Sequence, residues 1–107
     1  MNIIRHGDIL LKSIKREGLK LKLIGKFSSY VIAEGETTGH RHTLTAEPQT
    51  MFEVLEDASG QRYLQMNYGG QISHQEHKTK TVMSDLYIVG REREFDYPSE
   101  QIKRVAD

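Results

Sequence analysis

The sequence contains no cysteine and no tryptophan, and it has no apolar run approaching the roughly 20 residues that span a membrane. The lack of cysteine excludes disulfides, thiolate metal ligands and thiol catalysis. The first residues of the chain are too polar to form the hydrophobic segment of a signal peptide. We therefore expect a cytoplasmic protein that does not associate with a membrane.

Net charge is also lacking, because 15 lysines and arginines balance 15 aspartates and glutamates. Dedicated nucleic-acid-binding domains are usually basic, so nucleic acid is not an expected partner. One local bias remains, since residues 12–26 hold lysines and arginines against Glu17 alone. We favour an exposed strand or loop protected by lysines here, with a patch for an anionic partner as the alternative.

Helical periodicity is absent over any stretch of twelve residues, and so are the G-x-G-x-x-G and P-loop motifs. Apolar and polar residues instead alternate with a period of two, and turn signals recur at short intervals. This pattern predicts an all-β protein, a small barrel or sandwich in which residues 1–107 form a single β domain. Strands are expected at 8–14, 29–34, 40–46, 50–56, 61–68 and 85–95.

Local patterns refine this prediction. Residues 57–60, Asp-Ala-Ser-Gly, predict a hairpin turn that joins two antiparallel strands. That hairpin would set Phe52 and Val54 against Leu64 and Met66. Residues 69–70, both glycine, suggest a second tight turn with positive φ, and the strict Leu/Lys alternation of residues 19–23 suggests a further strand.

Five histidines stand out, and four of them form two close pairs. In the first pair, alternation puts His40 and His42 on the same strand face as Leu44 and Ala46, which should point inward. Two inward imidazoles need partners, because an unpaired buried polar group costs free energy. A divalent transition metal such as zinc, nickel or iron would satisfy several imidazoles at once.

The second pair, His74 and His77, has a spacing of three, which does not share a face on a regular strand. His74 would lie on the face of Ile72, and His77 would be presented by a turn. Two ligand sets follow: His40, His42 and His74 with His77, or the same three with Glu76. A polar run with two lysines follows directly, which indicates that the strand ends before His77. We therefore favour His77 as the ligand, with Glu76 either supporting a ligand by a hydrogen bond or acting as a general base.

Two other features of the sequence fit structural roles. His6 is interpreted as a surface or strand-end histidine rather than a residue supporting the metal site. Arg91 and Arg93 would share a strand face, and cross-strand ion pairing is favoured over a grip on an anionic ligand.

The same motifs carry a resemblance. Residues 5–8, 33–42 and 74–77, with the charged ending from Arg91 onward, resemble a group of short bacterial and phage-encoded proteins with no assigned function. This resemblance implies a shared fold and shared histidines, but no activity. The segment from Gly35 to His42 is also similar to the first motif of cupins. It departs from that motif because no glutamate follows His42 at the expected short distance, the next one being Glu47, and the second cupin motif is not visible.

Three functions compete on these grounds. The first is a metal-dependent enzyme with three protein ligands, an open position for a small-molecule substrate, and Glu76 as the catalytic residue. The second is a non-catalytic binding module in which all four histidines hold a structural metal. The third is an accessory protein without metal, related to phage, that uses its lysine-rich early strands.

Overall fold

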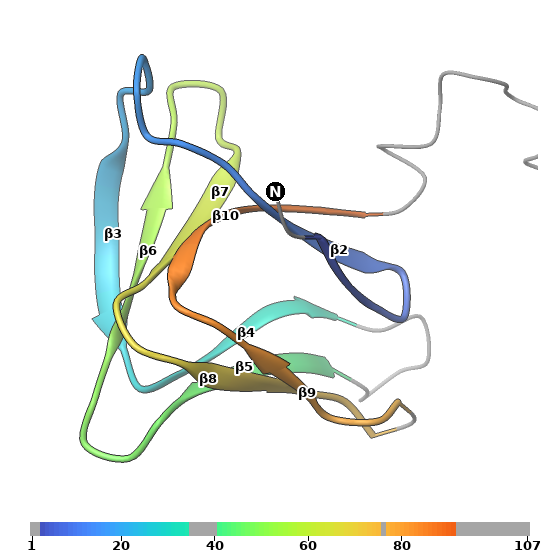
Figure 1. The fold of residues 1–107 in the computed structure, drawn as a ribbon. Helices are drawn as coiled ribbons and strands as arrows, with labels where there is room; N and C mark the ends of the chain where they lie inside the picture. The colour runs from blue at the N-terminus through green and yellow to red at the C-terminus, as the bar shows by residue number, and fades with distance from the viewer. Residues whose placement is uncertain (1–2, 35–40, 76, 92–107) are drawn as a thin grey trace, which may run out of the picture.

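The computed structural model describes residues 3–34, 41–75 and 77–91, and these residues form strands and no helix (Figure 1). The strands are β1 (Ile3–His6), β2 (Ile9–Ser13), β3 (Lys22–Phe27), β4 (Ser29–Glu34), β5 (Arg41–Ala46), β6 (Phe52–Glu56), β7 (Arg62–Met66), β8 (Gly70–Ser73), β9 (Lys80–Val82) and β10 (Asp85–Arg91). The predicted all-β class is confirmed. Within the described ranges, no helix is long and apolar enough to cross a membrane.

The strands form two antiparallel sheets. One sheet has six strands in the order β1-β2-β10-β7-β6-β3, and the other has four in the order β4-β5-β8-β9. The chain passes from one sheet to the other after β3, β5, β7 and β9, so each sheet is assembled from separate parts of the sequence. Of the two predicted architectures, the arrangement is a sandwich.

The main core lies between the sheets, where period-two alternation turns apolar side chains inward. Val54 on β6 faces Leu64 on β7 across the ladder, and both side chains are fully buried. This confirms the predicted hairpin and its burial. On the opposite sheet, Leu44 of β5 pairs with Ile72 of β8, and both belong to the same apolar cluster.

A second, smaller cluster covers the outer face of the six-stranded sheet. Leu55, Tyr63 and Leu86 are buried there, and Leu19 and Leu21 pack against them. Residues 19–21 thus cover a sheet face instead of forming a strand, and β3 begins only at Lys22. The strand expected over 19–23 is therefore found only at its last two residues. Leu19 and Leu21 pack against the sheet, whereas Leu23 is exposed on β3.

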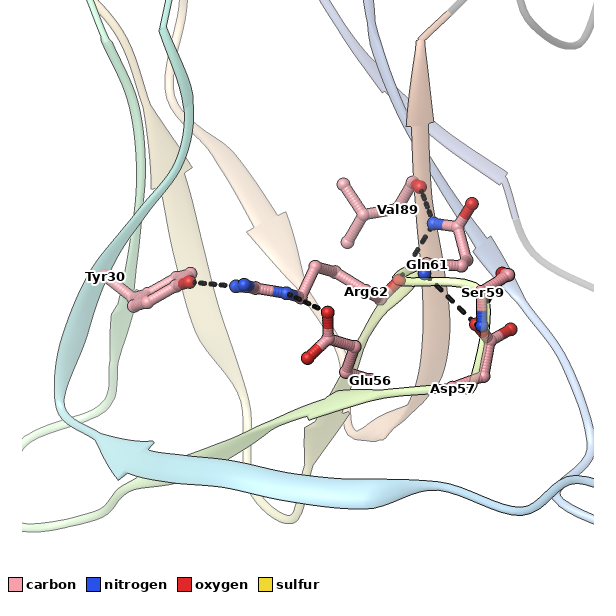
Figure 2. Close-up of polar contacts among 7 residues, drawn as sticks. All are labelled: Tyr30, Glu56, Asp57, Ser59, Gln61, Arg62 and Val89. Atoms are coloured by element: carbon pink, nitrogen blue, oxygen red, sulfur yellow. Dashed lines mark hydrogen bonds and ion pairs between the residues drawn. The ribbon is translucent and has the colours of Figure 1, made fainter.

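The side chain of Asp57 stabilises the turn between β6 and β7. Its carboxylate accepts hydrogen bonds from the amides of Ser59 and Gln61 at 2.9 and 3.1 Å, and from the Tyr63 hydroxyl at 2.9 Å. The Gln61 side chain reaches the carbonyl of Val89 on β10 (Figure 2). A network of this kind fixes the register of the hairpin.

Arg62 connects the two sheets. Its guanidinium donates a hydrogen bond of 2.6 Å to the Tyr30 hydroxyl on β4 and lies 3.8 Å from the carboxylate of Glu56 on β6 (Figure 2). Because β4 and β7 belong to different sheets, this contact links the two sheets of the sandwich.

The lysine-rich segment is partly balanced by the neighbouring strand. Lys22 lies opposite Glu56 and Lys26 lies opposite Glu53 in the β3–β6 ladder. Opposite charges in directly facing positions favour strand pairing. These two lysines therefore fit the interpretation of a protected edge strand better than that of a free anion-binding patch.

The expected second tight turn does not form at residues 69–70. Neither Gly69 nor Gly70 is among the residues with positive φ, and the connection from β7 to β8 crosses between the sheets. Gly70 serves close packing instead, since a Cβ there would lie 2.5 Å from the carbonyl oxygen of Thr45.

The predicted strand limits differ from the observed ones at several ends. Position 40 and positions 92–95 of the expected strands lie outside the described residues. Strands β1 and β9 were not predicted, and of β3 only the first two residues were. All three are edge strands, and β1 and β9, with four and three residues, are too short to give much periodic signal.

Candidate metal centre

Four histidines from both sheets meet at one end of the sandwich. His6 ends β1, His42 is the second residue of β5, His74 follows β8 directly, and His77 lies in the connection to β9. Figure 1 shows the β1–β2 turn and the β8–β9 connection at the same end of the molecule, away from β3. The cluster therefore joins the six-stranded sheet, through His6, to the four-stranded sheet.

The rings are in mutual contact. The His42 and His74 ring centroids are 4.4 Å apart, and those of His74 and His77 are 4.7 Å apart. His6 lies 5.2 Å from His42, 5.6 Å from His77 and 6.3 Å from His74, and the remaining pair, His42 and His77, is 6.0 Å apart. Each imidazole is thus a neighbour of the other three.

The four side chains differ in exposure. His6 and His42 are 2% and 1% exposed, His74 is partly buried, and His77 is exposed. The cluster is therefore buried from solvent on the side formed by β1 and β5, and it is exposed to solvent at the β8–β9 connection.

The two buried imidazoles contact each other directly. Nδ1 of His6 lies 3.0 Å from Nδ1 of His42, and Nε2 of His6 lies 2.8 Å from the carbonyl oxygen of Lys78. A carbonyl oxygen only accepts hydrogen bonds, so Nε2 of His6 carries a proton. In neutral His6, Nδ1 is then an unprotonated lone pair that faces His42.

An ion pair lies behind His42. The Asp8 carboxylate places Oδ1 3.5 Å from Nε2 of His42, and its Oδ2 accepts a hydrogen bond of 2.6 Å from Nη1 of Arg91. Asp8 and Arg91 are both about one-third exposed. Arg91 thus forms an ion pair with a carboxylate of the protein itself, which agrees with the favoured interpretation of this residue. Arg93 lies outside the described residues.

Burial keeps the inner histidines neutral. It lowers the pKa of His42 to about 4, with further lowering by the neighbouring His74 and His6. Burial also lowers the pKa of His6, although its hydrogen bond to the Lys78 carbonyl opposes this. Both side chains are therefore in the neutral form that binds metals at physiological pH.

Gly7 makes room for the cluster. It has φ of +63°, and a Cβ at this position would lie 2.8 Å from Nε2 of His77 and 3.0 Å from Cε1 of His42. Any other residue would both strain the backbone and push the imidazoles apart. The tight approach of β1 to the β8–β9 connection thus depends on glycine.

The sequence-based site prediction has a mixed outcome. His42, His74 and His77 lie together, with His42 inward on the face of Leu44 and His77 presented beyond the end of β8 as expected. His40 and Glu76 lie outside the described residues. His6 does lie at a strand end, one of the two positions expected for it, but it is buried within the cluster and not on the surface.

The signal that could have identified His6 is the His-Gly-Asp sequence, in which glycine permits a tight turn and both neighbours are potential metal-site residues. Among the described residues, no group of three or more His, Asp or Glu side chains is arranged so that it could hold a metal ion. The four imidazoles are gathered, but the facing nitrogens of His6 and His42 contact each other, and the second nitrogen of His6 contacts a backbone carbonyl.

Comparison with known proteins gives a family but no activity. No curated protein and no solved structure matches the chain significantly. Residues 5–92 match a protein family described as a domain of unknown function (DUF8820), and this range contains every histidine of the cluster. This match covers most of the chain. The chain therefore belongs to this family, which is described as a domain of unknown function (DUF8820).

Proposed function

We propose that this protein binds one divalent transition metal through the imidazoles of His6, His42, His74 and His77. Neutral imidazole is a good ligand for zinc, nickel, iron and copper, and a poor one for magnesium or calcium. A set made mainly of histidines therefore favours zinc, nickel or iron, the metals expected from the sequence.

The spacing of the four rings is the observation that carries this proposal. Four imidazoles bound tetrahedrally at Zn–N distances of about 2.0–2.1 Å would have ring centres roughly 5 Å apart. The six observed centroid separations span 4.4 to 6.3 Å around that value. Rotation about the Cβ–Cγ bond redirects the nitrogens while leaving a ring centre nearly in place, so modest side-chain rotation would bring donors to a common point.

The inner pair supports the same conclusion. The Nδ1 lone pair of His6 faces Nδ1 of His42 at 3.0 Å, close to the roughly 3.3 Å that separates two ligands of a tetrahedral zinc ion. His6 donates its Nε2 proton to the Lys78 carbonyl, the kind of outer contact that orients metal-binding histidines. His6 is thus already in the tautomer that binds metal through Nδ1.

The identity of the ligand from the first histidine pair is open to a direct test. His40, the expected partner of His42, lies outside the described residues, whereas His6 is seen beside His42 in the cluster. Alanine variants of His6 and His40 form a matched pair. We expect His6→Ala to reduce bound metal strongly, and full metal in His6→Ala with loss in His40→Ala would restore the original ligand set.

Whether the metal is catalytic depends on the exposed side of the cluster. A catalytic site needs an open coordination position, whereas a structural site is closed by its protein ligands. His77 is the exposed member and lies on a connection, so it is the ligand that water or a small-molecule substrate would replace. A metal-dependent enzyme, with Glu76 as its base, remains part of this proposal, and a closed binding or accessory protein is the alternative.

A cytoplasmic location, a similarity to cupins and a relation to phage proteins are further parts of the proposal. The first is supported by the lack of cysteine, which suits a reducing compartment. The second rests on the Gly39-His40-Arg41-His42 motif. Each can be tested separately, by cell fractionation, by determining the bound ligand and by the genomic neighbourhood.

The experiment is a measurement of bound metal in tag-free protein that has been dialysed against zinc, nickel or iron(II). We expect one equivalent per chain in the wild type and none in His42→Ala or His74→Ala. His77→Ala should bind more weakly but still bind, while Glu76→Gln should keep the metal. Full metal in both His42→Ala and His74→Ala, with the fold intact by circular dichroism, would refute the proposal.

A further inference from the structure

The residues around His42 suggest how the site is prepared for a metal. A neutral imidazole carries one proton, on either Nδ1 or Nε2. Nε2 of His42 faces the Asp8 carboxylate, which is an acceptor and carries a negative charge. A lone pair on Nε2 would be repelled by that carboxylate, whereas a proton on Nε2 would be attracted.

In the metal-free protein, the 3.0 Å contact between the two Nδ1 atoms is a hydrogen bond, and His42 is its donor because the Lys78 carbonyl holds the proton of His6 on Nε2. A metal bound at these two nitrogens would take the place of the shared proton. His42 would then carry its proton on Nε2, beside the Asp8 carboxylate, which favours that tautomer.

On this geometry we propose that Asp8 is a positioning residue, which stabilises the tautomer that His42 adopts when it binds metal through Nδ1, and that Arg91 holds Asp8 in place. This inference rests on the proposed metal binding. It adds an outer layer to the site, made by a carboxylate from the β1–β2 turn and a guanidinium from β10.

Arg91 matters because Asp8 is partly exposed and could otherwise turn toward water. The 2.6 Å hydrogen bond from Nη1 to Oδ2 uses one carboxylate oxygen and leaves Oδ1 directed at His42. A charge-assisted hydrogen bond of this length is strong enough to fix the rotamer of a short side chain. The Asp8 carboxylate thus joins Arg91 of β10 to His42 of β5.

The first test compares zinc affinities by competition with a chromophoric chelator. We expect Asp8→Asn to weaken zinc binding by about 10- to 100-fold, as is typical when the hydrogen-bond partner of a ligating histidine is removed. Glu17→Gln removes the same charge from an exposed position and serves as the control, with an unchanged affinity expected. Equal affinities of Asp8→Asn and wild type would overturn the inference.

The second test separates positioning from simple charge. Arg91→Met removes a positive charge near the metal, so a purely electrostatic role predicts tighter zinc binding. Positioning predicts weaker binding, and it predicts no further loss when Arg91→Met is added to Asp8→Asn. Tighter binding in Arg91→Met, or full additivity in the double variant, would contradict the inference.

The third test needs no variant and so does not depend on how well a variant folds. Long-range ¹H–¹⁵N spectra of the zinc-loaded wild type report which nitrogen of each histidine holds metal and which holds a proton. We expect zinc on Nδ1 and a proton on Nε2 for His42. Coordination of His42 through Nε2 would refute the role of Asp8 while leaving metal binding intact, whereas absence of zinc binding would refute the proposed function itself.

Discussion

Gly7 shows how a single residue controls the cluster. Replacing it with alanine would place a methyl group 2.8 Å from Nε2 of His77, at a φ of +63° that alanine disfavours. We predict that Gly7→Ala weakens zinc binding at least tenfold, and chelator competition measures this. Gly18, which has a φ of +80° and open space around it, is the matched control. If Gly7→Ala and Gly18→Ala bind zinc equally well, the close approach at Gly7 is not needed.

His42 and His6 show how far sequence reasoning reaches at this scale. The inward direction of His42 was predictable, because alternation with Leu44 depends only on local backbone geometry. The burial of His6 was not, since it requires β1 to pair with β2 and to lie against Lys78, more than 70 positions away. Local patterns carry no information on such a contact.

Among the elements, the β6–β7 hairpin was predicted most completely. Its turn residues, its register and the burial of Val54 all follow from the local sequence. The positions of β1, β3 and β9 were not predictable in the same way. They are edge strands whose place is set by neighbouring strands and by which sheet the chain joins after each crossing.

The core of this hairpin provides a stability test. Val54→Asp would bury a carboxylate without a partner between the sheets, and we predict a loss of at least about 3 kcal/mol in the free energy of unfolding. Glu53→Asp, on the outer face of the same strand, should change it by less than about 0.5 kcal/mol. Urea denaturation measures both. Similar midpoints for Val54→Asp and wild type would show that position 54 is not in the core.

The turn itself gives a pH prediction. Hydrogen bonds from Ser59, then from Tyr63 and Gln61, lower the pKa of Asp57 from 3.8 to about 2. A carboxyl group with a lowered pKa stabilises the fold above its unfolded pKa, and the stabilisation is lost as pH falls from about 4 to 2. Asp57→Ala should therefore melt below wild type at pH 7, with the difference shrinking across that window. A difference that stays constant from pH 7 to 2 would contradict this.

At the level of the whole molecule, the histidine cluster lies where β1 and the β1–β2 turn meet the four-stranded sheet. Among the described strands, β1 pairs only with β2, and His6 is its one fully buried side chain. Contacts between the sheets on this side include those of His6 and Lys80 with backbone carbonyls and that of Asp8 with His42. A metal bound by His6 together with histidines of the other sheet would therefore join the two sheets.

Metal binding should consequently stabilise the whole fold. A ligand that binds only the native state contributes about 4 kcal/mol at a thousand-fold excess over Kd. We predict a higher melting temperature with zinc, and a return to the metal-free value with chelator. The effect should shrink as pH falls toward the His42 pKa of about 4, because ligating histidines must be neutral. A melting curve that is the same with zinc and with chelator at every pH from 5 to 8 would contradict metal binding.

The most direct measurement is X-ray absorption spectroscopy on zinc-loaded, tag-free protein, which reports the atoms around the metal without reference to any variant. We predict one zinc per chain with three or four nitrogen ligands at about 2.0–2.1 Å and the outer-shell scattering of imidazole rings. A stoichiometry far below one, or a first shell of oxygen atoms without imidazole scattering, would contradict it.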